Sequence, residues 1–525
     1  MVEALLAVIR AQQDRIRELE ETVQQLRDEI AILKGQKSRP QIAPSRLEQP
    51  APRPPLTEGQ KRPGSQKRPK NAQLTITQEI RVPFPDPPAG SVSRGYEEYI
   101  VQELVMRVEI TRYLRERIVT ADGQSLLAPL PADVLPGQHF GPNVTCHILH
   151  QYHNNHVTQP LLQDELAQRG ITISAGQINH ILTEDKEVFH QEKAELLAAG
   201  LASARYIQVD DTGARHQGKN GYCTQIGNEL FAYFASTDKK SRLNFLEVLR
   251  GEHHDYVINE VAVAYWQKYA LSAALIASLA EGPTDFVDAA AWNARLQTLG
   301  VTGARLVRIT TEGALLGSLI AHGVSPELVV LSDGAGQFTI LVHAACWVHA
   351  ERPLARMIPH NEEHRLAIER VRQQIWELYR DLKAYRQEPQ PAQVPVLTAR
   401  FDALCAQPTD YPSINNVLHE MREHQVDLLR VLERPEVPLH NNASESDIRD
   451  YVKKRKISGS TRSDDGRRCR DTFASLKKTC RKLGIRFWDY LLDRIRGLDA
   501  IPRLADLIRA AAAHASTGKV QAAPT

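Results

Sequence analysis

Four acidic residues stand where their carboxylates could hold a metal ion. Asp210 closes the apolar run of a predicted strand, and Asp211 follows it directly. Asp333 closes a second apolar run before a glycine turn, while Glu445 starts a predicted helix, on one face with Arg449. An acid at the end of an apolar strand is costly unless it faces a site or a cation. Because Mg²⁺ prefers oxygen ligands, and two ions about 4 Å apart stabilise the attacking and leaving oxygens, these acids predict a two-magnesium site for phosphoryl transfer.

Short strands and a helix must position these acids. Residues 206–212, 222–226 and 231–236 are predicted strands separated by tight turns, which makes them an antiparallel meander. A helix is expected over 240–249, and residues 327–332 have the apolar pattern of a buried strand. The chain is therefore expected to belong to the α/β class.

The first 35 residues carry a heptad pattern. Its a positions are occupied by Ile9, Ile16, Val23 and Ile30, and its d positions mostly by leucine. This combination favours a parallel two-stranded coiled coil, so residues 1–35 are predicted to be a dimerisation helix. The alternative is one amphipathic helix packed on its own chain.

Residues 36–73 are predicted to form a basic, proline-rich linker. Residues 34–70 hold ten Lys or Arg against two acids, a net charge of +8. So many prolines and charges cannot make a core, and the segment either follows phosphates or serves as a solvated spacer. Beyond it, Met106, Val108 and Ile110 alternate with charged residues, so a small β-rich module is expected over 74–141.

Residues 142–200 have the pattern of a helical, helix-turn-helix-like DNA-binding region. One predicted helix ends at Gly170, and a second begins at Ser174, which with Gln177 forms a capping box. Gln177 and Asn179 on the second helix could then reach base edges. The alternative is a helical hairpin that binds nothing.

A strongly basic segment follows Glu445. Residues 451–482 hold twelve Lys or Arg against three acids, a net charge of +9. The predicted DNA-contacting cations are Lys453, Lys454, Arg455, Lys456, Arg462, Arg467, Arg468 and Arg449. Charge runs are often solvated faces, but this one adjoins a predicted phosphoryl-transfer centre, so phosphate contact is expected.

The composition narrows the class of protein. The 525 residues are too many for one ordinary domain, and their 42% hydrophobic content supports several packed cores. No apolar run is long enough for a membrane span, and the N-terminus does not resemble a secretory signal. Six scattered cysteines without a C-x-x-C pair exclude a disulfide framework and common zinc sites, and they fit a reducing cytosol. The two basic blocks indicate a polyanionic partner, with double-stranded DNA the first candidate.

Five motifs in this order resemble the DDE transposases of the IS66 insertion-sequence family. They are Asp-Asp-Thr at 210–212, Ser-Asp-Gly at 332–334, Cys-Trp-Val-His-Ala at 346–350, Asn-Asn-Ala-Ser-Glu at 441–445, and the closing stretch from Arg455 to Tyr490. The resemblance covers roughly residues 140–500. It implies an RNase H-like core that cleaves transposon ends and joins them to target DNA.

The resemblance also implies roles for individual residues. Asp210, Asp333 and Glu445 match the catalytic acids that hold two Mg²⁺ ions, with Mn²⁺ as a substitute. Asp211 occupies the position of the family's usual glutamate and is kept as a further metal ligand. Cys346 and His349 match a C-x-x-H element, which we interpret as structural or DNA-facing because two ligands do not make a zinc site.

The expected organisation combines this core with insertions. The core is divided over 201–251, 326–350 and 437–500, the last part carrying the basic segment. Helical insertions are expected over 252–325 and 351–436, and a C-terminal helix and tail over 501–525. The family commonly has a cysteine-rich zinc module before the core, whereas residues 74–140 contain no cysteine. The competing function is a catalytically inactive, transposase-derived DNA-binding protein; a structure-specific nuclease on the same core also stays open.

Overall fold

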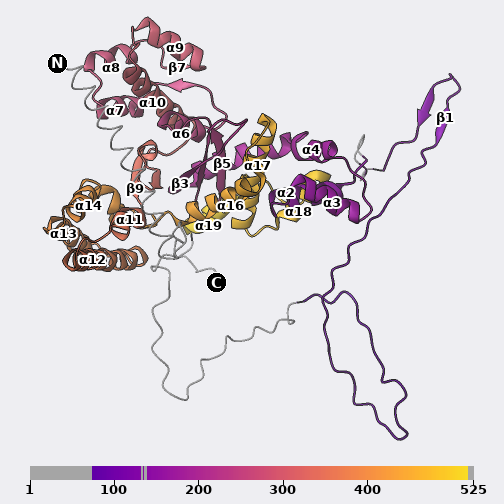
Figure 1. Cartoon of the computed structure of the whole chain (residues 1–525). Coiled ribbons are helices and arrows are strands. Elements are labelled where there is room, and N and C mark those ends of the chain that lie inside the picture. Colours follow the sequence, from indigo (N-terminus) through magenta and orange to yellow (C-terminus); the bar gives the residue numbers. More distant parts are fainter. Residues whose placement is uncertain (1–73, 132–133, 135–138, 518–525) are drawn as a thin grey trace. The chain divides into compact units, whose positions relative to one another are not determined.

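The computed structural model describes residues 74–131, 134 and 139–517 (Figure 1). The predicted coiled coil (1–35) and the predicted linker (36–73) lie outside the described residues. Within the part that is described, no helix is long and apolar enough to cross a membrane.

The chain divides into two compact units, residues 1–105 and 106–525. In the first unit, the described residues 74–105 form no helix or strand. The second unit begins with a hairpin of two short antiparallel strands, β1 (Arg117–Val119) and β2 (Ser125–Leu127). This hairpin is all the β structure described in the expected β-rich module.

The prediction of a strand around Met106, Val108 and Ile110 is therefore wrong. These residues have no assigned secondary structure, and their side chains are exposed, Ile110 by 87%. Alternation of apolar and charged residues produces a strand only when the apolar face has something to pack against. No described element covers these side chains, so the local pattern has no core to join.

A five-stranded mixed sheet forms the centre of the second unit. Its strands are β3 (Tyr206–Gly213), β4 (Tyr222–Gly227), β5 (Ala232–Thr237), β8 (Val329–Ser332) and β9 (Val342–Ala345). Their order is β5-β4-β3-β8-β9. The first three strands are antiparallel, which confirms the predicted meander, and β8 and β9 are parallel to β3.

A helical group precedes the sheet. It contains α2 (Pro142–His153), α3 (Gln159–Gln168), α4 (Ala175–Thr183) and α5 (Glu187–Ser203). Gly170 has a φ of +86° at the turn between α3 and α4, and the Ser174 hydroxyl accepts a hydrogen bond from the Gln177 amide at 3.1 Å. Both features confirm the predicted turn and N-terminal cap.

The first predicted insertion is mainly helical, as expected. After α6 (Arg242–Leu249) come β6 (Tyr256–Val257), α7 (Glu260–Lys268), α8 (Ala273–Ala280), β7 (Asp285–Phe286), α9 (Ala289–Thr298) and α10 (Ala304–Ala321). α10 packs closely on α7 and β6, where Gly313 lies against Trp266 and Gly317 lies against the Val257 carbonyl. The absence of a Cβ at these glycines permits the close approach.

The second predicted insertion is also helical. It contains α12 (Glu362–Gln387), α13 (Gln393–Ala406), α14 (Pro412–Glu423), α15 (Gln425–Leu428) and a 3₁₀ turn, η2 (Arg430–Leu432). α11 (Trp347–Arg356) leads into it from the core segment, and a second 3₁₀ turn, η1 (Gly336–Phe338), lies between β8 and β9. The apolar stripe predicted on the long helix, which is α12, is buried along its length. These residues serve core packing, as the sequence indicated.

Four helices close the chain. They are α16 (Asn442–Ser458), α17 (Asp464–Lys482), α18 (Phe487–Arg496) and α19 (Leu504–Thr517). α16 packs on β3 and β4, and α17 packs on β5. A small apolar cluster that includes Cys223, Phe234 and Tyr451 fills this face of the sheet. The opposite face, with Ile207 and Val209, joins the large core under α5, α6 and α10.

Candidate active site

The register of the sheet brings two of the predicted acids to one level. β3 and β8 are parallel, with Gln208 opposite Leu331. Continuing this register by two residues places Asp210 beside Asp333, just beyond the last residue of β8. The carboxyl ends of parallel neighbouring strands are where open α/β sheets commonly place their sites.

Asp210 and Asp211 serve opposite faces of the sheet, because successive side chains of a strand alternate. Asp210 shares the face of its register partner Gln225, whose side chain contacts Asp447 of α16. Asp211 lies on the other face, where its carboxylate is 2.9 Å from the Lys240 ammonium and accepts a hydrogen bond from Gln337 at 2.8 Å. The two neighbours therefore have different partners.

Glu445 comes to the same face from α16. Asn441, at the start of this helix, donates its side-chain amide to the Val209 carbonyl at 2.8 Å, one residue before Asp210. Glu445 is one turn further along, and its carboxylate pairs with Arg449 at 2.9 Å, as the i, i+4 spacing predicts. Its Oε1 atom is buried and has no hydrogen-bond partner. The helix start is thus tied to the strand that carries Asp210.

The charges around Asp210 act on one another. Burial raises the pKa of Asp210 to about 7, and the negative charges of Asp333, Asp211 and Glu445 add to the rise, against a hydrogen bond from the Asp211 amide. The nearby acids also raise the pKa of Lys240, against its partial burial. The site is therefore a concentration of negative charge, which Lys240 at Asp211 and Arg449 and Arg352 at Glu445 only partly offset.

Cys346 and His349 have different surroundings. Cys346 is buried, its amide donates to the Ser332 carbonyl, and its sulfur accepts the Asn441 amide at 3.3 Å. Burial raises the pKa of Cys346 to about 11, which keeps the thiol protonated. His349 Nε2 lies 3.7 Å from a Glu445 oxygen, and burial lowers its pKa. Cys346 thus braces the segments that carry two of the acids, while His349 faces Glu445.

The donor set fits magnesium better than a transition metal. The three acids offer oxygen ligands only. Glu445 Oε1 is a buried acceptor that has no hydrogen bond and only longer ion pairs, to His349 at 3.7 Å and Arg352 at 3.6 Å, so a cation could satisfy it. The oxygens of Asp210, Asp333 and Glu445 do not all lie within 4.8 Å of one another. Two ions about 4 Å apart can share one bridging carboxylate. Each of the other two carboxylates then needs to bind only one of the ions.

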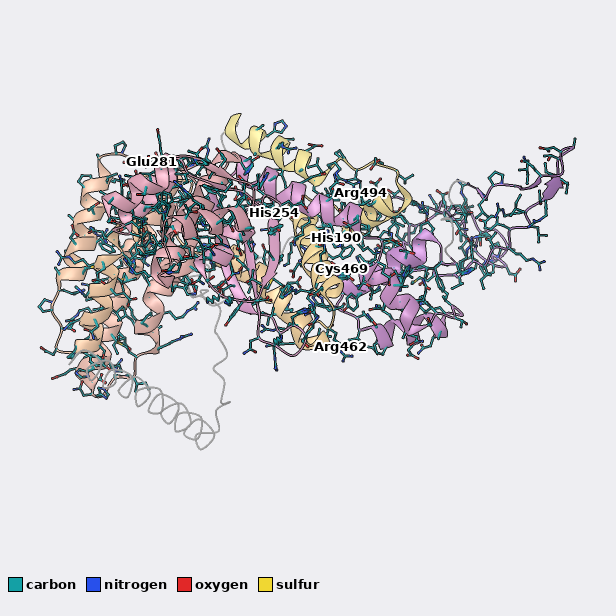
Figure 2. All side chains as sticks on the ribbon, turned by 90° about the horizontal axis from the view of Figure 1, so that it is seen from above. His190, His254, Glu281, Arg462, Cys469 and Arg494 are labelled. Atoms are coloured by element: carbon teal, nitrogen blue, oxygen red, sulfur yellow. The ribbon has the colours of Figure 1, made fainter. Side chains whose placement is uncertain are left out.

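The basic segment is only partly available to DNA. Arg449, Lys453, Lys456, Arg462 and Arg468 are exposed, and Figure 2 labels Arg462 on the connection between α16 and α17. Of these five, Arg449 pairs with Glu445, and Arg468 pairs with Glu187 at 3.0 Å. These side chains can reach a phosphate, since surface ion pairs are weak.

Lys454 corrects the prediction. It is buried, and its ammonium donates to the Tyr152 carbonyl at 2.8 Å and lies 3.3 Å from the centre of the Tyr152 ring. The prediction that Lys454 contacts a phosphate is therefore wrong. Every third or fourth residue of α16 faces the protein interior, and Lys454 is one of them. Arg455 and Arg467 are half-buried, with Arg455 on the Gly213 carbonyl and Arg467 on Asp238.

The predicted base-reading residues lie on α4. Asn179 is exposed and accepts a hydrogen bond from Gln159 at 3.3 Å, while Gln177 is half-buried in the first turn. The helix has the exposed N-terminal turn that a recognition helix needs, but its contact with bases stays a prediction.

Sequence reasoning missed several residues of the site. Lys240 and Gln337 bind Asp211, Arg352 lies 3.6 Å from Glu445, and Asn441 fixes the start of α16. Asn441 opens the quoted motif at 441–445, and Gln337 and Arg352 lie just beyond the motifs at 332–334 and 346–350, which was the available signal. Lys240 offered no such signal, because its role depends on how distant segments pack.

The chain can now be compared with known proteins. A family model described as "Transposase IS66 family" matches residues 328–468, from the start of β8 into α17. An uncharacterized protein of Sinorhizobium fredii, y4jO, is 44% identical over 322 residues, which are 60% of this chain and 100% of that protein. The match to the family includes Asp333, the C-x-x-H element and Glu445, the segments that meet beside β3. The chain belongs to the IS66 family of transposases.

Proposed function

We propose that the chain is a DDE-type DNA transposase, in which Asp210, Asp333 and Glu445 hold two Mg²⁺ ions. The observation that carries this proposal is the convergence of β3, β8 and α16, which gathers acids from three distant segments. Burial, and then the neighbouring acids, raise the pKa of Asp210 to about 7, which supports the proposal because a buried carboxylate among like charges resists ionisation until a cation arrives. Mn²⁺ would substitute with the same oxygen ligands.

We further propose that the sheet is an RNase H-like core. Three antiparallel strands followed by two parallel strands, in the order β5-β4-β3-β8-β9, support this interpretation. In this arrangement β3 is central, so its carboxyl end is flanked on one side by β8 and covered by α16. The predicted core segments, 201–251, 326–350 and 437–500, contribute these elements.

The chemistry we propose is two successive in-line displacements at phosphorus. Bound metal ions would polarise the phosphate and stabilise the attacking and leaving oxygens. In the first displacement a water oxygen forms a bond to phosphorus, and the 3′-oxygen of the transposon end leaves. In the second, that 3′-hydroxyl attacks target DNA, and another 3′-oxygen leaves. Asp210, Asp333 and Glu445 provide the negative ligands, so no protein nucleophile is needed.

Double-stranded DNA is the proposed partner. The exposed cations Lys453, Lys456 and Arg462 lie downstream of Glu445 on α16 and on the connection after it, so a backbone bound there would lie near the acids. Gln177 and Asn179 of α4 are the proposed base contacts. Asp210 is the proposed ligand rather than Asp211, because Asp211 is already bound by Lys240 and Gln337 on the other face of the sheet.

The decisive experiment is Mg²⁺-dependent cleavage of DNA that carries the ends of the element encoding this chain. Asp210→Asn, Asp333→Asn and Glu445→Gln should each lower cleavage by at least about 10³-fold, as loss of groups that act as a unit does. The matched control, Asp238→Asn, removes an exposed acid after β5 and should cleave normally. Affinity for DNA should stay within a few-fold for all four variants.

The competing functions give different results in the same assay. A catalytically inactive DNA-binding protein would bind the ends without metal-dependent cleavage in the wild type. A structure-specific nuclease would cleave but would not join a pre-cut 3′-hydroxyl end to target DNA. Strong activity of Glu445→Gln would contradict the assignment of the acids.

Dimerisation through residues 1–35 is a separate proposal, since these residues lie outside the described part of the chain. Removing them should convert a dimer, measured by light scattering, into a smaller species. An unchanged mass would show that another surface holds the chains together.

A further inference from the structure

A second cluster of metal-ligand side chains lies away from the acids, where the loop between α6 and β6 meets the end of α10. It consists of His253, Asp255 and His322. Among the residues that the structure describes, this is the one group of His, Cys, Asp or Glu side chains whose three ligand atoms all lie within 4.8 Å of one another. The proposed transposase chemistry makes no use of it.

The spacing within the cluster suits a single ion. The His322 Nε2 atom is 2.9 Å from an Asp255 carboxylate oxygen, and the rings of His253 and His322 are stacked with centroids 3.4 Å apart. A tetrahedral ion with ligands at about 2.0–2.1 Å separates those ligands by about 3.3 Å. Because the lone pairs of imidazole nitrogens lie in the ring planes, one of the two stacked rings must turn out of the stack for all three ligand atoms to face one ion.

Neighbouring groups hold the cluster in place. The buried Ser318 hydroxyl donates to the same Asp255 oxygen at 3.1 Å, and Arg250 donates to the Asp255 carbonyl at 2.8 Å. Ser318 and His322 are four residues apart at the end of α10, so they approach Asp255 from one helix. Metal ligands are commonly oriented by such supporting hydrogen bonds.

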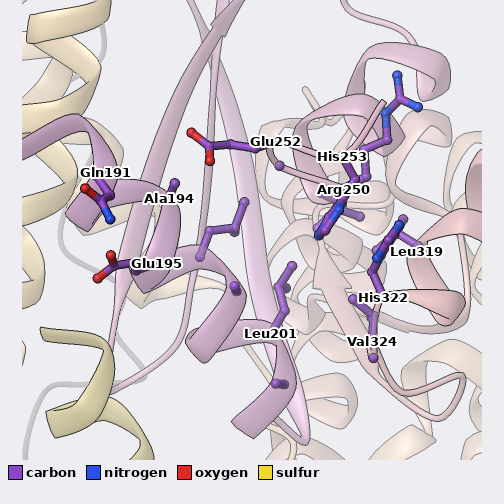
Figure 3. Close-up of a pocket in the computed structure, with 16 residues that line it drawn as sticks. Gln191, Ala194, Glu195, Leu201, Arg250, Glu252, His253, Leu319, His322 and Val324 are labelled. Carbon is purple, nitrogen blue, oxygen red and sulfur yellow. The ribbon is translucent and has the colours of Figure 1, made fainter. Parts of the chain in front are cut away.

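The cluster also opens onto a cavity. A space of about 300 Å³ lies between the ends of α5, α6 and α10, and His253 and His322 form part of its lining (Figure 3). Glu195 and Glu252 line the same cavity, and Arg503 holds the Glu195 carboxylate at 2.8 Å. An ion at the cluster would have room for water or another small ligand in its remaining position.

We propose that His253, Asp255 and His322 form a binding site for a divalent transition-metal ion of the Zn²⁺ type. Two imidazoles and one carboxylate suit Zn²⁺, Co²⁺ or Ni²⁺, whereas Mg²⁺ prefers oxygen ligands alone. The bound ion joins the α6–β6 loop to the end of α10, and so ties together the beginning and the end of the first helical insertion. This site is separate from the magnesium site proposed above.

The test measures zinc binding to the full chain. Purified protein, stripped of metal and kept in excess Mg²⁺ to occupy the carboxylate site, is dialysed against Zn²⁺ and its metal content is measured. Wild type should hold one additional, tightly bound zinc ion per chain that His253→Ala and His322→Ala lack. The zinc affinity of this site should fall by more than about 100-fold in each of these variants. His254→Ala removes the adjacent exposed histidine (labelled in Figure 2) and is the matched control, expected to bind like wild type.

Two further measurements keep the result clear. Replacing zinc with Co²⁺ should give visible absorption bands of a low-coordinate site in wild type and in His254→Ala, but not in the two ligand variants. Melting temperatures in chelator should be alike for all four proteins, which shows that the variants fold. Equal zinc content in wild type and His253→Ala would overturn the proposal, as would loss of zinc in His254→Ala.

Discussion

Replacing Asp210 by asparagine should make the metal-free protein more stable. The ordinary pKa of an aspartate is about 3.9, whereas burial and the neighbouring acids raise that of Asp210 to about 7. Above pH 7 the folded protein must therefore hold a charge that it disfavours. At about 1.4 kcal/mol for each tenfold change in proton affinity, the upper limit of this cost is about 4 kcal/mol.

The sign of the pH dependence follows from the same shift. Because the folded pKa lies above the unfolded one, the folded chain binds more protons between about pH 4 and pH 7. The wild type therefore loses stability as the pH rises through this window. Asparagine keeps the shape and the acceptor for the Asp211 amide but carries no charge. Its advantage should be near its maximum at pH 8 and smaller at pH 5.

Thermal unfolding in chelator and in Mg²⁺ checks this reasoning. At pH 8 without metal, Asp210→Asn should melt several degrees above wild type, at about 2–4 °C per kcal/mol for a domain of 150–250 residues. Added Mg²⁺ should raise the melting temperature of wild type much more than that of the variant, because ligand binding stabilises only a state that binds it. Asp238→Asn, at an exposed acid, should behave like wild type. A metal-free variant no more stable than wild type, or one that gains equally from Mg²⁺, would refute the argument.

Two further substitutions test the packing around the site. Burial, and then two nearby cations, lower the pKa of Lys454 to about 7, so wild-type stability should rise between pH 7 and about pH 10. Lys454→Met should lack this rise. Its free energy of unfolding relative to wild type, measured by thermal unfolding, should therefore fall from pH 7 to pH 9 by up to about 1.4 kcal/mol per pH unit. Gly317→Ala would place a Cβ 2.1 Å from the Val257 carbonyl and should cost about 1–3 kcal/mol in thermal unfolding. Gly303→Ala should cost much less, because its Cβ would make only an ordinary contact, 3.9 Å from Leu306.

Local sequence patterns predicted many of the helices and strands, including the strand that carries Asp210. The meander from β3 to β5, the helix cap at Ser174 and the apolar stripe of α12 each follow from residues close in sequence. Turn residues and apolar spacing act over a few residues, so one sequence is enough to detect them. The strand prediction around Met106 was wrong because a local pattern carries no information about whether a packing partner exists.

The parallel pairing could not be predicted in this way. β8 joins β3 after more than a hundred intervening residues, which include β4, β5 and the first helical insertion. Likewise, Lys454 lies in a basic run whose charge suggests exposure, yet the turn of α16 directs it onto Tyr152. The cluster at His253 depends on contact with His322 from another helix. In each case the contact partners are distant in sequence and leave no periodic signal.

The pairing register, rather than the presence of acids, decides which aspartate belongs to the site. Asp210 and Asp211 are adjacent and chemically alike, so residue type cannot separate them. A strand turns neighbours to opposite faces, and shifting the register by one residue would exchange them. Here the face of Asp210 is also the face covered by α16, while Asp211 is held by Lys240. Asp211→Asn should therefore remove one partner of Lys240 but leave Mg²⁺-dependent stabilisation largely intact. Loss of that stabilisation in Asp211→Asn, with its retention in Asp210→Asn, would show that the strand presents the other acid to the metal.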